Sequence, residues 1–321
     1  MTRALVIGRR RPGRKIAEAV RATRKGLKAA GWSVDATVVD TKKRLRRDAK
    51  RAVKAGIDVV VAVGGDGAVS QVIQSLAGTK TALGIIPMGT GNLLAGNLTI
   101  PGAIEDAVKV LVTGGRRRID LGRLTVDGRR TMFAVACGVG FDAEVMASTD
   151  PEDKRHLGKL AYVASAIRRQ ANVHDVTHEV TLDGVQKSME ATQVLIANFG
   201  GMGEGVKARL EVEPDDGLLD VLVIRASGPL GGLLAGWEAL RQDEPGESPE
   251  GHVYRTRARK IRIATVARRL VETDGSVAGR TPIRVSVRPA ALTVVVPAAG
   301  PDAKGGDAGS DDPGPPDDAA S

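Results

Sequence analysis

The sequence predicts an N-terminal α/β domain built on a parallel sheet, followed by a second domain of mostly antiparallel β-structure. In the first half, short apolar runs alternate with helical patterns, as they do in βαβ units. Beyond about residue 116, strands separated by hairpin turns replace that pattern. The 321 residues also exceed the roughly 250 to 300 at which a single core usually splits. We therefore expect domains at 1–118 and 119–297, with the last strand free to return to the first domain, and a disordered acidic tail at 298–321.

The strands expected in the first domain cover residues 4–8, 34–39, 57–63 and 82–87. The run 57–63 is nearly continuous and β-branched, which is typical of a central parallel strand covered on both faces. After each strand, apolar residues recur at helical spacing, over 16–27, 45–53, 69–76 and 104–111. Helices of this kind cover a sheet and make a three-layer domain. The second helix is also strongly basic, because its other faces carry Lys42, Lys43, Arg44, Arg46, Arg47, Lys50, Arg51 and Lys54.

The second domain is expected to begin with two hairpins, whose turns are Asp127-Gly128 and Asp183-Gly184. One helix is expected over 157–170. Further strands are expected at 121–126, 132–139, 217–225, 260–266, 283–287 and 292–296. Residues 242–251, rich in Glu, Pro and Gly, predict a loop.

Composition narrows the class of partner. The formal charge is +9, but the segment after residue 297 contributes −5, which leaves +14 on the rest. Such a surplus suits anionic membrane surfaces, nucleic acid or phosphate-bearing ligands. Aromatic residues are only 2%, too few for base-stacking platforms, so no nucleic-acid partner is expected. No run approaches the roughly 20 apolar residues of a membrane span, so we expect a cytoplasmic protein that associates with membranes peripherally.

A glycine-rich turn follows the predicted central strand, in the sequence Val63-Gly-Gly-Asp-Gly-Ala68. Such a turn lies at the carboxyl edge of a parallel sheet, where α/β folds bind ligands and backbone N–H groups approach phosphate. An acid among phosphate-facing amides is repelled unless it holds Mg²⁺ or water, so Asp66 is predicted to join a metal network. A tight turn that Asp66 merely caps is an equally good explanation of this motif alone.

A second glycine turn, Met88-Gly-Thr-Gly-Asn92, follows the next strand. Two adjacent parallel strands that both end in such turns predict one composite pocket at the same edge.

Two better-known phosphate-binding motifs do not match this sequence. The run Gly8 to Lys15 has its lysine one place late for a P-loop, with Ile16 where Ser or Thr would bind Mg²⁺. A dinucleotide-binding glycine fingerprint is missing after the first strand.

Taken together, these motifs resemble the diacylglycerol kinase catalytic-domain superfamily, which includes bacterial lipid kinases and sphingosine and ceramide kinases. The resemblance runs through residues 62–67, 83–95, 97–98, 100–101, 119–122, 138–142, 216–220 and 273–275. It implies an α/β nucleotide-binding domain like that of NAD kinases, a β-sandwich, and an active site in the cleft between them.

The resemblance also implies roles for individual residues. Asp66 and Asp120 would belong to an Asp–water–Mg²⁺ network, and a second, structural Mg²⁺ would use Glu213, Asp216 and Leu218, partly through carbonyl oxygens. ATP would contact the two glycine turns and one strand end, namely Thr41, Gly64, Gly65, Asp66, Gly67, Ala68, Val69, Ser70, Gln71, Gly89, Thr90, Gly91 and Asn92.

The chain departs from the family pattern at several of these places. Ala68 stands where Thr is usual and Gln71 where Glu is usual, and Leu93 replaces an Asp of the metal network. Ser276 occupies the position of the family's proton-accepting acid. Because serine is no general base near neutral pH, the lipid proton must go to Asp274, Asp66 or solvent.

The function that we expect is therefore ATP- and Mg²⁺-dependent phosphorylation of a lipid hydroxyl at the membrane surface, with diacylglycerol as the leading acceptor. Anionic phospholipid is the expected membrane partner, and the oligomeric state is open, with a homodimer among the alternatives. Other hypotheses are a kinase for another lipid such as a sphingoid base, an enzyme like NAD kinase or phosphofructokinase, a pseudokinase that binds nucleotide or lipid, and a nucleic-acid binder.

Overall fold

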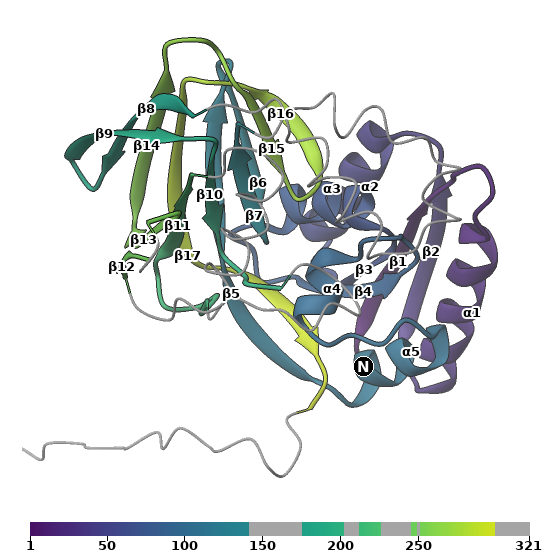
Figure 1. Cartoon of the computed structure of the whole chain (residues 1–321). Helices are drawn as coiled ribbons and strands as arrows, with labels where there is room; N and C mark the ends of the chain where they lie inside the picture. Colours follow the sequence, from purple (N-terminus) through teal and green to yellow (C-terminus); the bar gives the residue numbers. More distant parts are fainter. Residues whose placement is uncertain (141–174, 202–211, 226–244, 249–250, 299–321) are drawn as a thin grey trace, which may run out of the picture.

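The computed structural model describes residues 1–140, 175–201, 212–225, 245–248 and 251–298 (Figure 1). The expected helix at 157–170 and nearly all of the expected acidic tail lie outside these residues. Within the described part, the α/β domain and the antiparallel β domain are both present, so the predicted fold class is confirmed.

The α/β domain alternates strands and helices as its apolar pattern predicted. Its elements are β1 (Arg3–Arg9), α1 (Ile16–Ala29), β2 (Ser33–Val39), α2 (Lys42–Lys54), β3 (Val59–Gly64), α3 (Asp66–Leu76), β4 (Ala82–Pro87), α4 (Leu93–Asn97) and α5 (Ile104–Thr113). The four strands run parallel in the order β2-β1-β3-β4. Because β3 and β4 are central, every one of their residues is buried.

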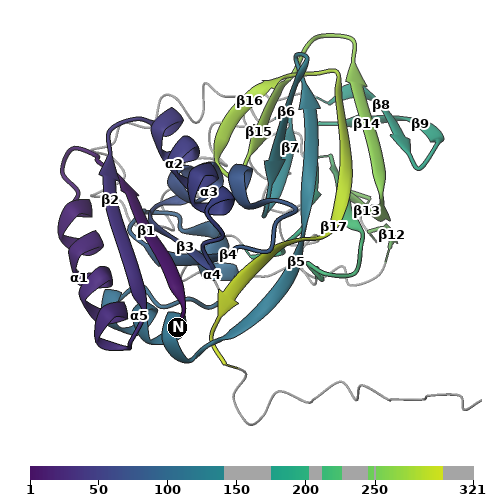
Figure 2. The ribbon, with the colours of Figure 1, turned by 180° about the vertical axis from the view of Figure 1, so that it is seen from behind.

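The helices divide between the two faces of this sheet. The chain steps from β1 outward to β2 and then back past β1 to β3, so right-handed crossovers place α1 and α2 on opposite faces. Helix α1 packs with α5, and α2 packs with α3 (Figures 1 and 2). Helix α3 also contacts the second domain at β6, which places it between α2 and the β domain.

The second domain is a sandwich of two sheets. Its strands are β5 (Gly115–Val126), β6 (Arg129–Phe133), β7 (Ala136–Val139), β8 (Val176–Leu182), β9 (Val185–Ala191), β10 (Gln193–Ala197), β11 (Leu219–Ile224), β12 (Gly246–Glu247), β13 (Val253–Ala258), β14 (Lys260–Thr265), β15 (Leu270–Thr273), β16 (Ser276–Arg280) and β17 (Ile283–Val296). The sheet β12-β13-β11-β10-β7-β15-β16 is entirely antiparallel. Alternate residues of both sheets form the sandwich core.

Strand β17 joins the two domains into one ten-stranded sheet. Its first part pairs with β14 and β5, and its end pairs in parallel with β4 through Val294 and Leu83. Leu292, Val294 and Val295 are buried in the core of the α/β domain. The sequence pattern suggested two strands here, at 283–287 and 292–296. The structure instead has one strand with an irregularity after Arg288, since the pairing with β5 resumes only at Leu292.

Another expected strand is divided. The run 132–139 forms the end of β6 and all of β7, with a break at Ala134 and Val135. Both residues are apolar and buried, so the sequence pattern does not mark the break.

The two predicted hairpin turns are present. Their residues all have the positive φ that a two-residue turn requires, namely Asp127, Gly128, Asp183 and Gly184.

Candidate active site

The two glycine turns touch each other at the carboxyl edge of the parallel sheet. Gly65 follows β3 and Gly89 follows β4, and a Cβ atom built on Gly65 would lie 2.8 Å from the Cα atom of Gly89. The reverse distance, from a Cβ on Gly89 to the Cα of Gly65, would be 2.6 Å. No side chain fits at either position, so glycine is required where the two backbones cross.

Asp66 ties the turns together. It is the first residue of α3, and its carboxylate accepts hydrogen bonds from the backbone N–H groups of Asn92 at 3.0 Å and Leu93 at 2.6 Å. Asn92 has a left-handed φ of 47°, and its Oδ1 accepts the N–H of Gly89 at 2.9 Å. Burial raises the pKa of Asp66, although these amides act in the opposite direction.

Asp274 brings a second carboxyl group from the other domain. It lies in the turn between β15 and β16 and accepts hydrogen bonds from the amides of Ala134, Val135 and Ala136 at 2.8, 2.8 and 3.1 Å. The break between β6 and β7 turns these amides toward it. Burial raises the pKa of Asp274 to about 6, and the negative charge of Asp66 adds a smaller contribution in the same direction.

Asp66 and Asp274 line one small cavity of about 10 Å³. That volume suits about one water molecule or one small ion. The other lining residues are Val69, Ser70, Ile73, Leu93, Leu94 and Val135, so no basic side chain lines this cavity. One buried and one half-buried carboxyl group, with no basic side chain in the lining and only oxygen ligands, fit a hard divalent cation such as Mg²⁺. In the described residues no three His, Cys, Asp or Glu side chains form a metal cluster, so water or phosphate oxygens would complete the coordination.

Asp120 lies outside the cavity that Asp66 and Asp274 line. Its carboxylate accepts the N–H of Gly217 at 2.7 Å and that of Ala290 at 2.6 Å. Ala290 lies in the irregular part of β17 and has a positive φ of 47°. Asp120 therefore joins β5, the loop before β11 and β17 into one corner.

The loop predicted to hold a structural Mg²⁺ is stabilised by arginines. Arg117 donates to both carboxylate oxygens of Asp215 at 2.9 Å. Asp216 accepts the N–H of Leu218 at 2.9 Å and lies 3.6 Å from Arg257. Glu213 is exposed. Two carboxylates of this loop, Asp215 and Asp216, therefore lie beside arginines. A cation held by Glu213, Asp216 and Leu218, partly through carbonyl oxygens, stays a prediction.

The residues expected to contact ATP surround this edge. Thr41 is exposed and caps α2, its Oγ1 accepting the N–H of Arg44 at 3.2 Å. Ser70 lines the cavity. The side chains of Ala68 and Val69 are packed in the core, and Val69 also lines the cavity. Gly64 ends β3, Gly67 and Gln71 lie in α3, and Gly91 lies so close to Asp66 that a Cβ there would be 2.9 Å from Oδ2.

Sequence reasoning missed Arg14. Its guanidinium donates to the Oγ1 of Thr90 at 3.1 Å, which places a cation on the second glycine turn. The signal was present in the basic run from Gly8 to Lys15, which follows β1 at the same sheet edge. That run fails as a P-loop, but it supplies a positive charge near the two turns.

Comparisons with known proteins agree with this arrangement. The diacylglycerol kinase catalytic domain matches residues 3–124, and the YegS C-terminal NAD kinase β-sandwich-like domain matches residues 135–296, half of the chain. The chain belongs to the diacylglycerol kinase family of lipid kinases. Within the family, a protein named diacylglycerol kinase from Mycobacterium tuberculosis is 31% identical over 77% of this chain and 79% of its own length.

Two further relatives define how far the family match extends. A Pseudomonas aeruginosa protein named "Probable lipid kinase YegS-like" is 31% identical over 88% of this chain and 91% of its own length. An uncharacterised Synechocystis protein is 30% identical over 84% of this chain, which spans only 63% of that protein. The crystal structure of a diacylglycerol kinase from Bacillus anthracis shares the fold, with a TM-score of 0.74, 24% identity, and coverage of 92% of this chain and 96% of that one.

Proposed function

We propose that this lipid kinase transfers the γ-phosphate of ATP to a lipid hydroxyl, with diacylglycerol as the acceptor. The observation that carries the proposal is the meeting of Asp66 and Asp274 in one cavity, at the edge where the two glycine turns cross. The turns belong to the α/β domain, whereas Asp274 belongs to the β domain. Such an arrangement places an acid of one domain beside the phosphate-binding turns of the other.

The α/β domain supplies the phosphate site. Helix α3 begins at the sheet edge directly after Gly65, and a helix N-terminus favours negative charge. Arg14 adds a guanidinium on the Thr90 side of this site. We assign to Arg14 the role of orienting the nucleotide phosphates.

Asp66 is the residue that would hold Mg²⁺, because its oxygens lie at the turn and no basic side chain lines the cavity to balance its negative charge. When bound, Mg²⁺ neutralises phosphate charge during transfer. The amides of Asn92 and Leu93 fix the orientation of this carboxylate. Leu93 therefore contributes through its backbone at a position where its side chain offers no ligand.

Asp274 is the residue that we assign as proton acceptor. With a pKa of about 6 it is ionised near neutral pH and able to take the proton of the acceptor hydroxyl. Three backbone amides hold its carboxylate in place. Ser276 lies two residues further on in β16 and is half-buried, with a hydroxyl that does not ionise in this range.

A second candidate function rests on two departures from the family pattern. Leu93 replaces an acid of the metal network, and Ser276 replaces the proton-accepting acid. A protein without these two acids could bind nucleotide or lipid without turnover. In that case Asp66 and Asp274 would serve binding alone.

The test is a kinase assay with labelled ATP and Mg²⁺ in mixed micelles that contain diacylglycerol, ceramide, a sphingoid base or monoacylglycerol. We expect label in phosphatidic acid, and none with Asp66→Asn, whose fold is checked by thermal melting. Label on another lipid would change the acceptor. Binding of ATP without transfer to any lipid would favour the non-catalytic alternative.

A further inference from the structure

Helix α2 carries the densest positive charge among the helices that the structure describes. Its 13 residues include eight Lys and Arg and one acid, Asp48, which gives a net charge of +7. The buried side chains Leu45, Ala49 and Ala52 lie beneath the helix, and all eight basic side chains are exposed. For comparison, α1 has four basic residues and one acid, a net charge of +3.

The basic charge of α2 is poorly balanced. Asp48 lies within 3.3 to 3.7 Å of three arginines, Arg44, Arg47 and Arg51, so its single charge is shared among them. The first turn contains only basic charged residues, at the positive end of the helix dipole, where they are unfavourable. Within the described residues, no ion pair involves Lys42, Lys43, Arg46, Lys50 or Lys54. Charge arranged in this way disfavours the isolated fold and favours an anionic partner.

The helix lies on the outside of the molecule, on the side of the candidate site. It begins after β2 at the sheet edge that carries the glycine turns, and it packs along α3, whose residues line the cavity (Figure 1). Helix α3 is in turn joined to β6, because Gln74 exchanges two hydrogen bonds with the backbone of Met132, at 2.7 and 2.9 Å. A surface docked on α2 is therefore adjacent to the layer that carries the site.

We propose that the outer face of α2, formed by its eight basic side chains, docks onto an anionic lipid surface. This inference rests on the proposed function, because a lipid kinase must reach its acceptor at a membrane. The described helices offer no span that would anchor the chain otherwise. A duplex nucleic acid could take the same charge, but it has no part in the proposed reaction, and it is one outcome of the test below.

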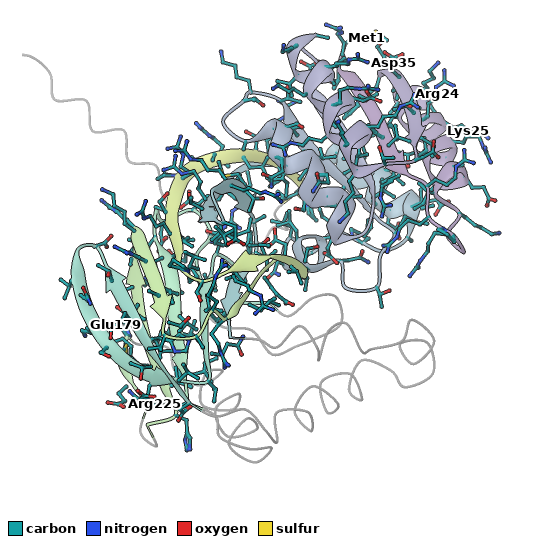
Figure 3. All side chains as sticks on the ribbon, turned by 90° about the horizontal axis from the view of Figure 1, so that it is seen from above. Met1, Arg24, Lys25, Asp35, Glu179 and Arg225 are labelled. Carbon is teal, nitrogen blue, oxygen red and sulfur yellow. The ribbon has the colours of Figure 1, made fainter. Side chains whose placement is uncertain are left out.

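Two matched variants test the surface. The first replaces Lys43, Arg46, Lys50 and Lys54 of α2 by Gln, and the control replaces Arg21, Arg24, Lys25 and Lys28 of α1 by Gln. Both remove four exposed positive charges, and α1 lies on the opposite face of the sheet, with Arg24 and Lys25 labelled in Figure 3. Thermal melting verifies that both variants fold.

The measurement is co-sedimentation with vesicles of phosphatidylcholine, with or without phosphatidylglycerol, in the absence of nucleotide. Wild-type protein should bind only the anionic vesicles, and less as salt rises. Since each basic residue at an anionic surface strengthens binding by roughly fivefold, loss of four should weaken binding of the α2 variant by about 10²-fold or more. The α1 control should stay within about twofold of wild type.

Three outcomes would overturn the proposal: equal losses in the two variants, equal binding to neutral vesicles, or retention on duplex DNA without vesicle binding. A kinase assay on a short-chain, water-soluble diacylglycerol separates this inference from the proposed function. There the α2 variant should keep the wild-type rate. If wild-type protein shows no turnover but only the α2 variant loses vesicle binding, the proposed kinase function is rejected and the proposed membrane surface is kept.

Discussion

At the scale of single residues, the two carboxyl groups of the cavity are distinguished by their surroundings. Asp66 accepts two amides from the neighbouring turn, and Asp274 accepts three from the break between β6 and β7. Both have raised pKa values because burial disfavours their charged forms. Perturbed acids in a shared cavity are characteristic of functional sites, and here each acid comes from a different domain.

Replacement of the proposed base tests its role directly. Asp274→Asn keeps the size of the side chain but cannot accept a proton, so the chemical step should fall by about 10² to 10⁴. Single-turnover kinetics at saturating ATP measure that step. Ser276→Glu is the matched variant and should be neutral or mildly activating. If Asp274→Asn keeps a fast chemical step, the proton acceptor must be Asp66 or solvent. If activity appears only in Ser276→Glu, the native chain is a pseudokinase.

The pH profile gives an independent readout. The pKa of Asp274 is raised to about 6, and the ionised form is the one that accepts a proton. The rate constant kcat/KM for the lipid should therefore rise as pH increases through about 6 and level off above it. This limb should disappear in Asp274→Asn. A profile that is flat between pH 5 and 7.5 in the wild type would contradict the assignment.

The phosphate-binding role proposed for Arg14 can be tested separately, because Arg14 does not line the cavity. Arg14→Gln removes the guanidinium beside Thr90, so KM for ATP should rise by about tenfold, the scale of one lost charged hydrogen bond. The KM for the lipid should stay nearly constant. Arg10→Gln, in the same basic run but paired with Asp40, is the control and should leave both constants unchanged. An equal rise in both variants would show that only the net charge of the run matters.

At the scale of elements, the corner formed by β5, β17 and the loop before β11 is held by arginine and backbone contacts. Asp120 binds two amides, and Arg117 pairs with Asp215. The Arg117–Asp215 pair is partly exposed, and such pairs contribute about 0 to 1 kcal/mol. The corner should therefore be stable without a divalent cation.

Removal of metal tests this corner. EDTA should leave Tm unchanged within about 1 °C, and Arg117→Gln should lower the free energy of unfolding by at most about 1 kcal/mol. Differential scanning fluorimetry with and without Mg²⁺ measures both. A Tm that falls with EDTA in the wild type but not in Asp216→Asn would establish a cation at Glu213, Asp216 and Leu218 after all.

At the scale of the whole molecule, β17 makes the two domains one structural unit. It begins in the sandwich beside β14 and ends in the α/β core beside β4. This continuity fixes the hairpin that carries Asp274 relative to the turn that carries Asp66. It also explains how a small cavity forms between two domains, since their relative position is set by a shared sheet.

The sequence alone determined the elements and the phosphate-binding edge. Apolar runs at 57–63 and 82–87 identify buried parallel strands, and the glycine turns after them mark where a ligand approaches, because these features depend on neighbours within a few residues. Only the tertiary structure decided which acids meet. Asp274 reaches the cavity through a break at Ala134 and Val135 that no local pattern marks, and Asp120 is drawn to Gly217 and Ala290 instead. These contacts join residues about 100 to 200 positions apart, and such pairings are selected by packing of whole sheets, which local propensity does not encode.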